Sequence, residues 1–180
     1  WGYDRPREVL APLSQGSFHG MPWFQWIDGS FARDTCIAVA PPREGAEATA
    51  PAATFDARST PLGIAFAPAD HGDPMLRRNA VVAVHGSWAT LPSGGGGGDP
   101  ATRRPPKLAL VESAGGLPTA VHDLVTGFQL ADGTRWARPA GIGFGADGNL
   151  YFTSDSGTHQ GLFRLRRRST PSGLLPLLLD

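Results

Sequence analysis

The sequence has only one cysteine, Cys36, and no long apolar run. A single cysteine cannot form an internal disulfide, so pairing gives no information on the redox compartment. We interpret Cys36 as a small residue in a part-buried loop. No apolar stretch approaches the roughly 20 residues that a membrane-spanning helix needs. The first six residues also lack the charged start and apolar stretch of a signal peptide. No membrane span is therefore expected.

An excess of charge of either sign is also missing. The 16 basic residues balance 16 acidic ones, so nothing favours a nucleic-acid partner. The five histidines show no spacing typical of a zinc or copper site, and no Gly-x-Ser-x-Gly motif indicates a serine hydrolase. The glycine run at residues 93–99 is not followed by the Lys-Ser or Lys-Thr of a phosphate-binding loop. We interpret it as a flexible insertion.

What the chain does have is glycine and proline, with 24 and 17 residues, and a repeated motif. Such a composition favours a turn-rich, all-β chain. Pro-Leu-Gly-Ile-Ala-Phe at 61–66 and Pro-Ala-Gly-Ile-Gly-Phe at 139–144 share the pattern Pro-x-Gly-Ile-x-Phe. In both copies a turn and an Asn then lead into a second apolar run. Repeats of about 40–50 residues are typical of four-stranded propeller blades.

The alternation of apolar residues between turn signals predicts seven strands in these two units. The first unit should contain four strands, at residues 61–66, 80–85, 107–111 and 120–128. The second should contain three, at 140–145, 149–154 and 161–165, with the Asp-Gly of residues 147–148 supplying a hairpin turn. So few blades cannot close a ring, and repeat units gain stability from neighbouring units. We therefore expect a partial propeller from a longer protein.

Four segments are predicted. The first is a partial blade at 1–58, with a Gly-Met-Pro loop and a surface excursion rich in Pro and Ala. A penultimate blade at 59–128 carries the glycine-rich insertion at 93–99, a last blade follows at 129–168, and a tail occupies 169–180.

Five motifs occur in an order that resembles the glucose/sorbosone dehydrogenase family. They are Phe-His-Gly-Met-Pro-Trp (18–23), Ser-Thr-Pro-Leu-Gly-Ile-Ala-Phe (59–66), Val-Ala-Val-His-Gly-Ser-Trp (82–88), Leu-Val-Thr-Gly-Phe (124–128) and Arg-Pro-Ala-Gly-Ile-Gly-Phe (138–144). The resemblance implies the last two to three blades of a six-bladed propeller that binds pyrroloquinoline quinone (PQQ) and Ca²⁺. It further implies oxidation of a sugar or a related aldehyde or alcohol, an external electron acceptor, and a periplasmic or secreted location.

Arg138 is the principal candidate for cofactor binding. PQQ carries three carboxylates, and a guanidinium can bind a carboxylate through two hydrogen bonds. The resemblance places Arg138 in the cofactor pocket. The alternative is a surface arginine that pairs with Asp132 or with a C-terminal carboxylate.

Three further positions carry weaker candidates. His85 matches a family motif and is the catalytic candidate, although a lone histidine also serves as a hydrogen-bonded structural residue. The resemblance assigns the backbone carbonyls of Gly20 and Pro22 to Ca²⁺, a cation that prefers oxygen ligands, and a structural turn is the alternative. Asp155 either faces the channel mouth as a ligand or base, or caps a local turn.

Departures from the family pattern leave the function open. Ala89 and Thr90 stand where the family has Asn and Arg, Arg58 replaces a histidine, and the family's base histidine would lie before residue 1. The fragment alone is expected to be inactive. Two alternatives remain: a non-catalytic propeller that binds a carbohydrate or a protein, and a calcium-dependent propeller lactonase or hydrolase.

Overall fold

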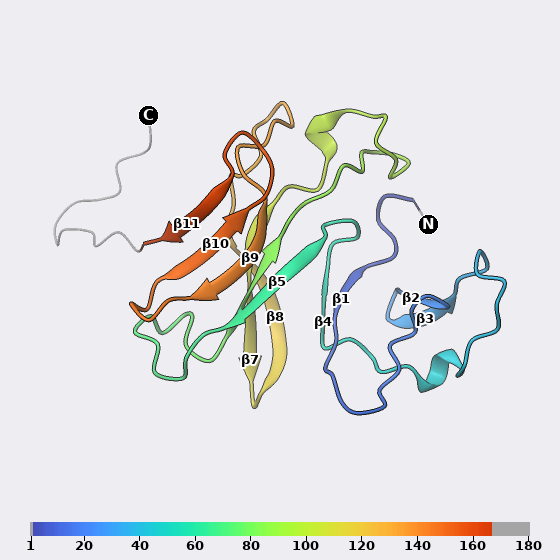
Figure 1. Ribbon diagram of the computed structural model, residues 1–180. Helices are drawn as coiled ribbons and strands as arrows, with labels where there is room; N and C mark the ends of the chain where they lie inside the picture. The colour runs from blue at the N-terminus through green and yellow to red at the C-terminus, as the bar shows by residue number, and fades with distance from the viewer. Residues whose placement is uncertain (1, 167–180) are drawn as a thin grey trace.

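The computed structural model describes residues 2–166 and contains strands, turns and two short 3₁₀ helices (Figure 1). No α-helix occurs among these residues, so the all-β prediction is confirmed. Within the same range, no helix has the length and apolar character needed to cross a membrane. The elements are β1 (Glu8–Leu10), β2 (Phe24–Ile27), β3 (Ser30–Arg33), η1 (Gly45–Glu47), β4 (Ala53–Phe55), β5 (Pro61–Phe66), β6 (Ala80–Val84), η2 (Pro100–Thr102), β7 (Lys107–Ala114), β8 (Leu117–Val125), β9 (Pro139–Phe144), β10 (Leu150–Ser154) and β11 (Gly161–Leu165).

The first repeat unit forms one four-stranded antiparallel sheet in the order β5-β6-β7-β8. All five residues of β6 are buried, which suits an inner strand that is covered on both faces. The outermost strand β8 instead alternates largely between exposed and half-buried residues. It runs from Leu117 to Val125 rather than to residue 128, because Gly127 has a positive φ of 87° and ends the strand.

The second unit forms a three-stranded antiparallel sheet with β10 between β9 and β11. In the β9–β10 hairpin, Gly148 has a φ of 73°, as expected for the turn. The backbones of β5 and β9 approach closely: a Cβ on Gly63 would lie 2.5 Å from the Ala140 carbonyl oxygen. This contact explains the glycine of the repeated motif in β5, since any larger residue would separate the two sheets.

The main core lies between these two sheets. Val81 and Leu110 of the first sheet belong to one buried cluster with Phe152 of the second. Phe128 stacks on Trp136 with centroids 5.1 Å apart, and Phe152 stacks on Phe163 at 5.2 Å. Phe128, which follows β8, also packs edge to face on Phe152 of β10 with centroids 5.6 Å apart, and this contact links the two repeat units.

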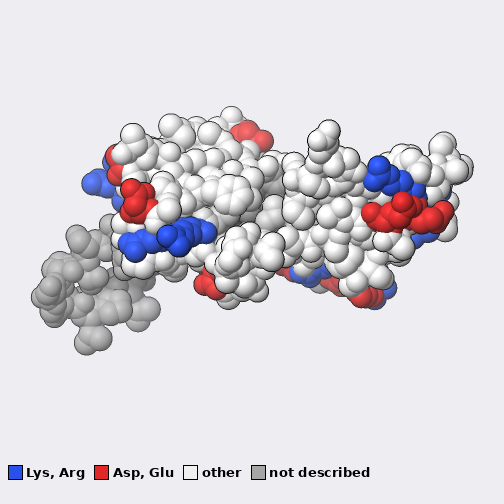
Figure 2. Space-filling model, turned by 90° about the horizontal axis from the view of Figure 1, so that it is seen from below, with Lys and Arg blue, Asp and Glu red and all other residues white. Residues whose placement is uncertain are grey.

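The N-terminal part contributes two small sheets, β1–β4 and the hairpin β2–β3. Phe55 of β4 is buried against Ala80 and Val82 on the opposite face of the first sheet. Cys36 lies in a loop after β3, as predicted, but it is exposed, so the partial burial predicted for it is wrong. On the face drawn in Figure 2, Lys and Arg side chains lie beside Asp and Glu side chains, and most of the surface is uncharged.

The glycine run differs from the flexible insertion that the sequence predicted. Thr90 is fully buried, and its hydroxyl donates to the Gly95 carbonyl at 2.7 Å and accepts from the Gly98 N–H at 2.8 Å. The loop is therefore folded around one side chain. Gly98 is required for space, since a Cβ there would meet the Leu91 carbonyl oxygen at 2.5 Å.

The sheets are separate, and the described residues do not close into a ring. The four-segment division and the partial propeller therefore stay predictions. Residues 167 and 168 of the predicted last blade and the tail at 169–180 lie outside the described residues.

Candidate functional site

Three arginines surround the indole ring of Trp88 at one end of the two main sheets. Trp88 follows β6, and the arginines come from the segment after η2 (Arg103) and from the approach to β9 (Arg135 and Arg138). Their guanidinium carbons lie 4.5, 5.3 and 5.0 Å from the ring centroid, respectively. We call these four residues the arginine site. Guanidinium groups at such distances are attracted to an indole face.

Arg138 is held by the backbone of the turn that follows β6. Its Nε donates to the His85 carbonyl at 3.1 Å and its Nη2 donates to the Gly86 carbonyl at 3.0 Å. Only 6% of the residue is exposed. The alternative of a surface arginine paired with Asp132 is therefore wrong. Arg138 instead joins the turn at the end of β6 to the start of β9.

Arg135 also hydrogen-bonds to the turn that follows β6. Its Nε donates to the Gln129 side-chain oxygen at 2.9 Å, and its Nη2 donates to the carbonyls of Ser87 and Arg104. The backbone around this turn is close-packed, since a Cβ on Gly86 would lie 2.7 Å from the Arg104 carbonyl oxygen. The position of Trp88 is thus fixed by buried hydrogen bonds on both sides of the turn.

Burial lowers the pKa of Arg138 and the nearby charge of Asp155 opposes this shift, so the positive charge of the arginine site is offset only in part. Among the described residues, no carboxylate forms an ion pair with Arg103, Arg135 or Arg138. The buried Nε of Arg103 and Nη1 of Arg135 have no hydrogen-bond partner. Burial and the neighbouring Arg138 and Arg103 charges lower the pKa of Arg135 to about 10. An anion bound here would reduce this repulsion.

His85 and Asp155 form a hydrogen-bonded pair beside the arginines. His85 Nε2 lies 2.7 Å from Asp155 Oδ1, with the histidine side chain 13% exposed and the aspartate 56%. The hydrogen bond from His85 lowers the pKa of Asp155 below its ordinary value. A carboxylate at Nε2 favours the tautomer with its proton there, which leaves the lone pair on Nδ1. Asp155 also accepts from Ser156 at 2.9 Å, so it serves both the local turn and the histidine.

Two hollows flank Trp88. One, of about 540 Å³, is lined by His85, Arg138, Gly94 and Arg58 among others. The second, of about 260 Å³, is lined by the three arginines and by Thr158. The structure therefore brings together the predicted residues His85 and Arg138.

Sequence reasoning missed Arg103 and Arg135. The only signal for Arg135 was its place three residues before Arg138, and nothing distinguished Arg103 from other loop arginines.

The predicted calcium loop borders another hollow only through Met21. Gly20 is buried with a φ of 84°, and its carbonyl accepts from the Phe24 N–H at 2.8 Å. The neighbouring Met21 lines a hollow of about 410 Å³ that also contains Arg58. No group of three or more His, Cys, Asp or Glu side chains suited to a metal occurs between residues 2 and 166. Calcium ligation by the Gly20 and Pro22 carbonyls stays a prediction.

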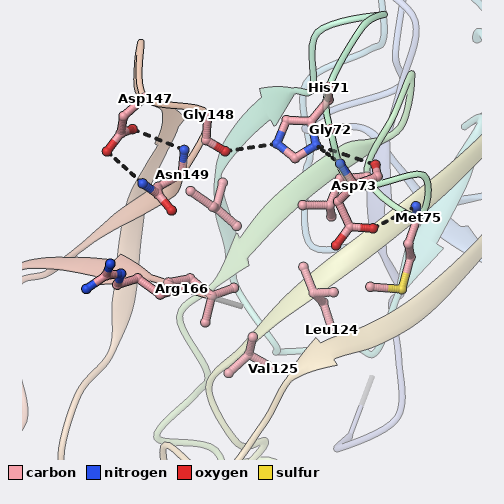
Figure 3. Close-up of a pocket in the computed structure, with 13 residues that line it drawn as sticks. His71, Gly72, Asp73, Met75, Leu124, Val125, Asp147, Gly148, Asn149 and Arg166 are labelled. Atoms are coloured by element: carbon pink, nitrogen blue, oxygen red, sulfur yellow. Dashed lines mark hydrogen bonds between the residues drawn. The ribbon is translucent and has the colours of Figure 1, made fainter. Parts of the chain in front are cut away.

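A larger hollow lies at the opposite ends of the strands, between the turns β5–β6 and β9–β10 (Figure 3). Its volume is about 720 Å³ and its floor contains Leu124 and Val125. His71 Nε2 and the Gly148 carbonyl oxygen lie 3.0 Å apart across its rim. None of the predicted site residues lines this hollow.

Comparison with known proteins identifies a related fold but no family. No family model matches the sequence, and no curated protein matches it. The calcium structure of a Trichoderma reesei enzyme of carbohydrate-active enzyme family AA12 matches with a TM-score of 0.65 and 20% sequence identity. The match covers 92% of this chain and 44% of that one. At this identity the match shows a shared fold, and the chain spans less than half of the matched structure.

This result corrects the resemblance inferred from sequence. The assignment to the glucose/sorbosone dehydrogenase family is wrong, because the structural match is to an enzyme of family AA12 and no family model supports the assignment. Four of the five ordered motifs lie at strands or strand ends of the two main sheets, and the first, at 18–23, precedes β2. Gly63, for example, is required by the contact between β5 and β9. A motif of this kind indicates how the sheets pack and does not by itself identify a family.

Proposed function

We propose that this chain is part of a carbohydrate-active oxidoreductase whose arginine site binds PQQ. The observation that carries the proposal is the group of three guanidiniums around Trp88 with no carboxylate among the described residues to pair with them. The AA12 enzyme of similar fold is named as carbohydrate-active, and its structure contains calcium. These two lines of support are independent.

The chemistry of the site suits a planar polyanion. PQQ is a flat ring system with three carboxylates, which guanidinium groups bind well, and an exposed indole offers a surface for stacking. When bound, PQQ supplies the acceptor for the two electrons removed from an alcohol or aldehyde carbon. Nucleotide cofactors are commonly bound by their phosphates at a helix N-terminus, and residues 2–166 contain no α-helix.

Each residue then has a specific role. Arg138, with Arg103 and Arg135 behind it, would hold the carboxylates. His85, oriented by Asp155, would accept the proton of the substrate hydroxyl at Nδ1. The carbonyls of Gly20 and Pro22 are the proposed calcium ligands. The substrate would be a sugar or a related aldehyde or alcohol, electrons would pass to an external acceptor, and the protein would act in the periplasm or outside the cell.

The partial propeller is part of this proposal. The four- and three-stranded sheets would be successive blades, and the remaining blades would complete the cofactor channel. We therefore expect this chain to bind the cofactor without turning over substrate.

One observation favours a second candidate, a non-catalytic propeller that binds a carbohydrate or a protein. The Thr90 hydroxyl is committed to the Gly95 carbonyl and the Gly98 N–H, and Ala89 is apolar. Neither residue can offer a polar group to a cofactor or substrate. This candidate predicts saccharide binding without PQQ binding.

Titration of the chain with PQQ in the presence of calcium, followed by tryptophan fluorescence, tests the first proposal. We expect saturable binding that weakens when calcium is chelated. Arg138→Gln should weaken binding by about 10- to 100-fold, the usual range for a lost charge-assisted hydrogen bond. Trp88→Ala, at a residue that is 58% exposed, should weaken it by up to about tenfold through lost stacking.

Arg5→Gln is the matched control, since Arg5 is 54% exposed and pairs with Asp28 on the surface. It should bind PQQ as the unmodified chain does. Because Trp88→Ala removes an exposed side chain, it should fold normally, and circular dichroism verifies this. Absence of saturable binding, or equal affinity in all three variants, would contradict the proposal.

A further inference from the structure

The hollow beside Met21 of the predicted calcium loop is separate from the arginine site and lies between β1 and the hairpin β2–β3. It has a volume of about 410 Å³, within the range of roughly 300–1,000 Å³ usual for small-molecule sites. We call it the N-terminal hollow. Polar and aromatic side chains line it together, including Arg7, Glu8, His19, Gln25, Trp26 and Phe31.

The polar groups of the N-terminal hollow are fixed in place. Burial raises the pKa of the Glu8 carboxyl group, while the backbone N–H groups of Arg58 and Thr60 hydrogen-bond to it. His19 Nε2 lies 2.8 Å from the Ser17 hydroxyl, and its buried Nδ1 has no partner. Gln25 donates from its amide nitrogen to Asp34 at 3.3 Å. The hollow thus presents a carboxyl, an imidazole and an amide.

The apolar part of the hollow is aromatic. Trp26 and Phe31 pack edge to face, with centroids 5.0 Å apart and planes at 73°. Met21 extends beside them and is 64% exposed. A half-buried indole next to hydrogen-bonding groups offers one flat apolar surface and several polar contacts.

We propose that the N-terminal hollow is a saccharide-binding subsite that holds one pyranose ring. A pyranose has an apolar face of C–H groups suited to an indole, and a rim of hydroxyls that donate to a carboxylate and exchange hydrogen bonds with imidazole and amide groups. Charge supports an uncharged ligand: Arg7 is paired with Asp56 at 3.1 Å, and Glu8 faces Arg58. The arginine site, by contrast, has an unbalanced positive charge.

Arg58 connects the two sites. It lines both the N-terminal hollow and the hollow that contains His85 and Arg138. Its Nε donates to the Gly2 carbonyl at 2.8 Å, which fixes the side chain between them. A saccharide bound in the N-terminal hollow would therefore extend toward the arginine site. This arrangement deepens the proposed function, on which it rests for the class of ligand.

Protein-observed NMR titration with D-glucose and cellobiose, without PQQ, tests the inference. We expect both sugars to bind in the millimolar range, with chemical-shift changes at the Trp26 indole and the Gln25 side chain. His19→Leu and Trp26→Leu should each weaken binding by at least about tenfold, the effect of losing one satisfied polar or stacking contact. Circular dichroism verifies that each variant folds.

His122→Leu is the matched control for His19→Leu, because His122 is exposed on β8, outside the N-terminal hollow. It should bind both sugars normally. Absence of sugar binding, normal binding by both hollow variants, or shifts confined to Trp88 would overturn the inference. Because PQQ is absent from this experiment, sugar binding and PQQ binding can fail independently, and each failure identifies the proposal that is wrong.

Discussion

Buried guanidinium groups usually face carboxylates, whereas those of Arg135 and Arg138 donate to backbone carbonyls. The carbonyls of residues 85 to 87 satisfy the hydrogen bonds but leave the net charge in place. The arrangement therefore keeps the turn rigid and leaves a positive field at Trp88. A ligand that supplies negative charge would also stabilise the fold, because it binds the folded state alone.

At the residue scale, Asp147 provides a test by pH. Its carboxylate accepts from the Asn149 N–H at 3.1 Å, the Asn149 side chain at 2.7 Å and the Tyr151 hydroxyl at 2.7 Å; Figure 3 shows the two bonds from Asn149. The Asn149 side chain is the largest cause that lowers the pKa of Asp147, to about 2 from an ordinary 3.8.

We expect the Asp147 carboxyl carbon to titrate near pH 2 by NMR, and Tyr151→Phe to raise that midpoint. Since the folded pKa is lowered, the contribution of Asp147 to stability is complete above pH 3.8 and is lost as the pH falls toward about 2. The same titration in Thr153→Val, a neighbouring exposed residue of β10, should be unchanged. Identical midpoints in the native protein and in Tyr151→Phe would show that the hydroxyl does not hold the carboxylate.

Arg138 was predictable from sequence because it begins the second copy of the repeat, where a strand end meets a loop. The contacts among the site residues were not predictable. His85 and Asp155 are 70 positions apart, and Arg103 reaches Trp88 only because η2 returns the chain to the end of β6. Contacts of this kind depend on how two sheets pack, which no local pattern encodes.

At the scale of elements, all seven strands of the two main sheets were predictable from alternation and turn residues. Five started and ended within one residue of expectation: β5, β6, β9, β10 and β11. The folded structure of the loop at 93–99 was not predictable, because a run of glycines has the composition of a flexible linker. Its fold depends on Thr90, whose hydroxyl bonds both to Gly95 and to Gly98.

We therefore expect two glycine-to-alanine substitutions in this loop to have unequal effects on stability. Gly94 has a φ of 80°, and a Cβ there would lie 2.7 Å from the Gly2 carbonyl oxygen and 2.9 Å from Arg58 Nε. Gly94→Ala should lower the free energy of unfolding by about 1–3 kcal/mol through backbone strain. At Gly97 a Cβ would meet nothing within 4 Å, so Gly97→Ala should be neutral or stabilise by up to about 1 kcal/mol.

Urea denaturation of the two variants measures this difference. Gly97→Ala is the control, because both substitutions lower the conformational entropy of the unfolded chain equally. Equal midpoints would mean that the loop is a flexible insertion, as its composition suggested.

At the scale of the whole molecule, one face of the first sheet is incompletely covered. Leu62, Ile64 and Phe66 of β5 are 55%, 40% and 73% exposed. They lie on the face that also carries Ala80 and Val82, because Phe66 pairs with Ala80 and Ile64 with Val82. The β1–β4 sheet covers only part of that face, through Phe55. Contiguous apolar surface of this kind marks an interface, whereas single exposed apolar residues are ordinary.

In a propeller this face would pack against the next blade, and the matched AA12 structure is more than twice as long as the part that this chain covers. We therefore expect the 180-residue chain to bind the apolar dye ANS. The double variant Leu62→Thr/Phe66→Thr should reduce ANS fluorescence by at least half. Threonine retains the β-branched shape that strands favour, and both side chains are exposed, so the free energy of unfolding should change by less than about 1 kcal/mol.

Leu13→Thr is the control, because Leu13 is a loop residue outside β5 that is 87% exposed. It should leave the ANS fluorescence unchanged. Equal fluorescence in the double variant and in Leu13→Thr would mean that β5 is not an open interface, and the blade arrangement would lose its main support at this scale.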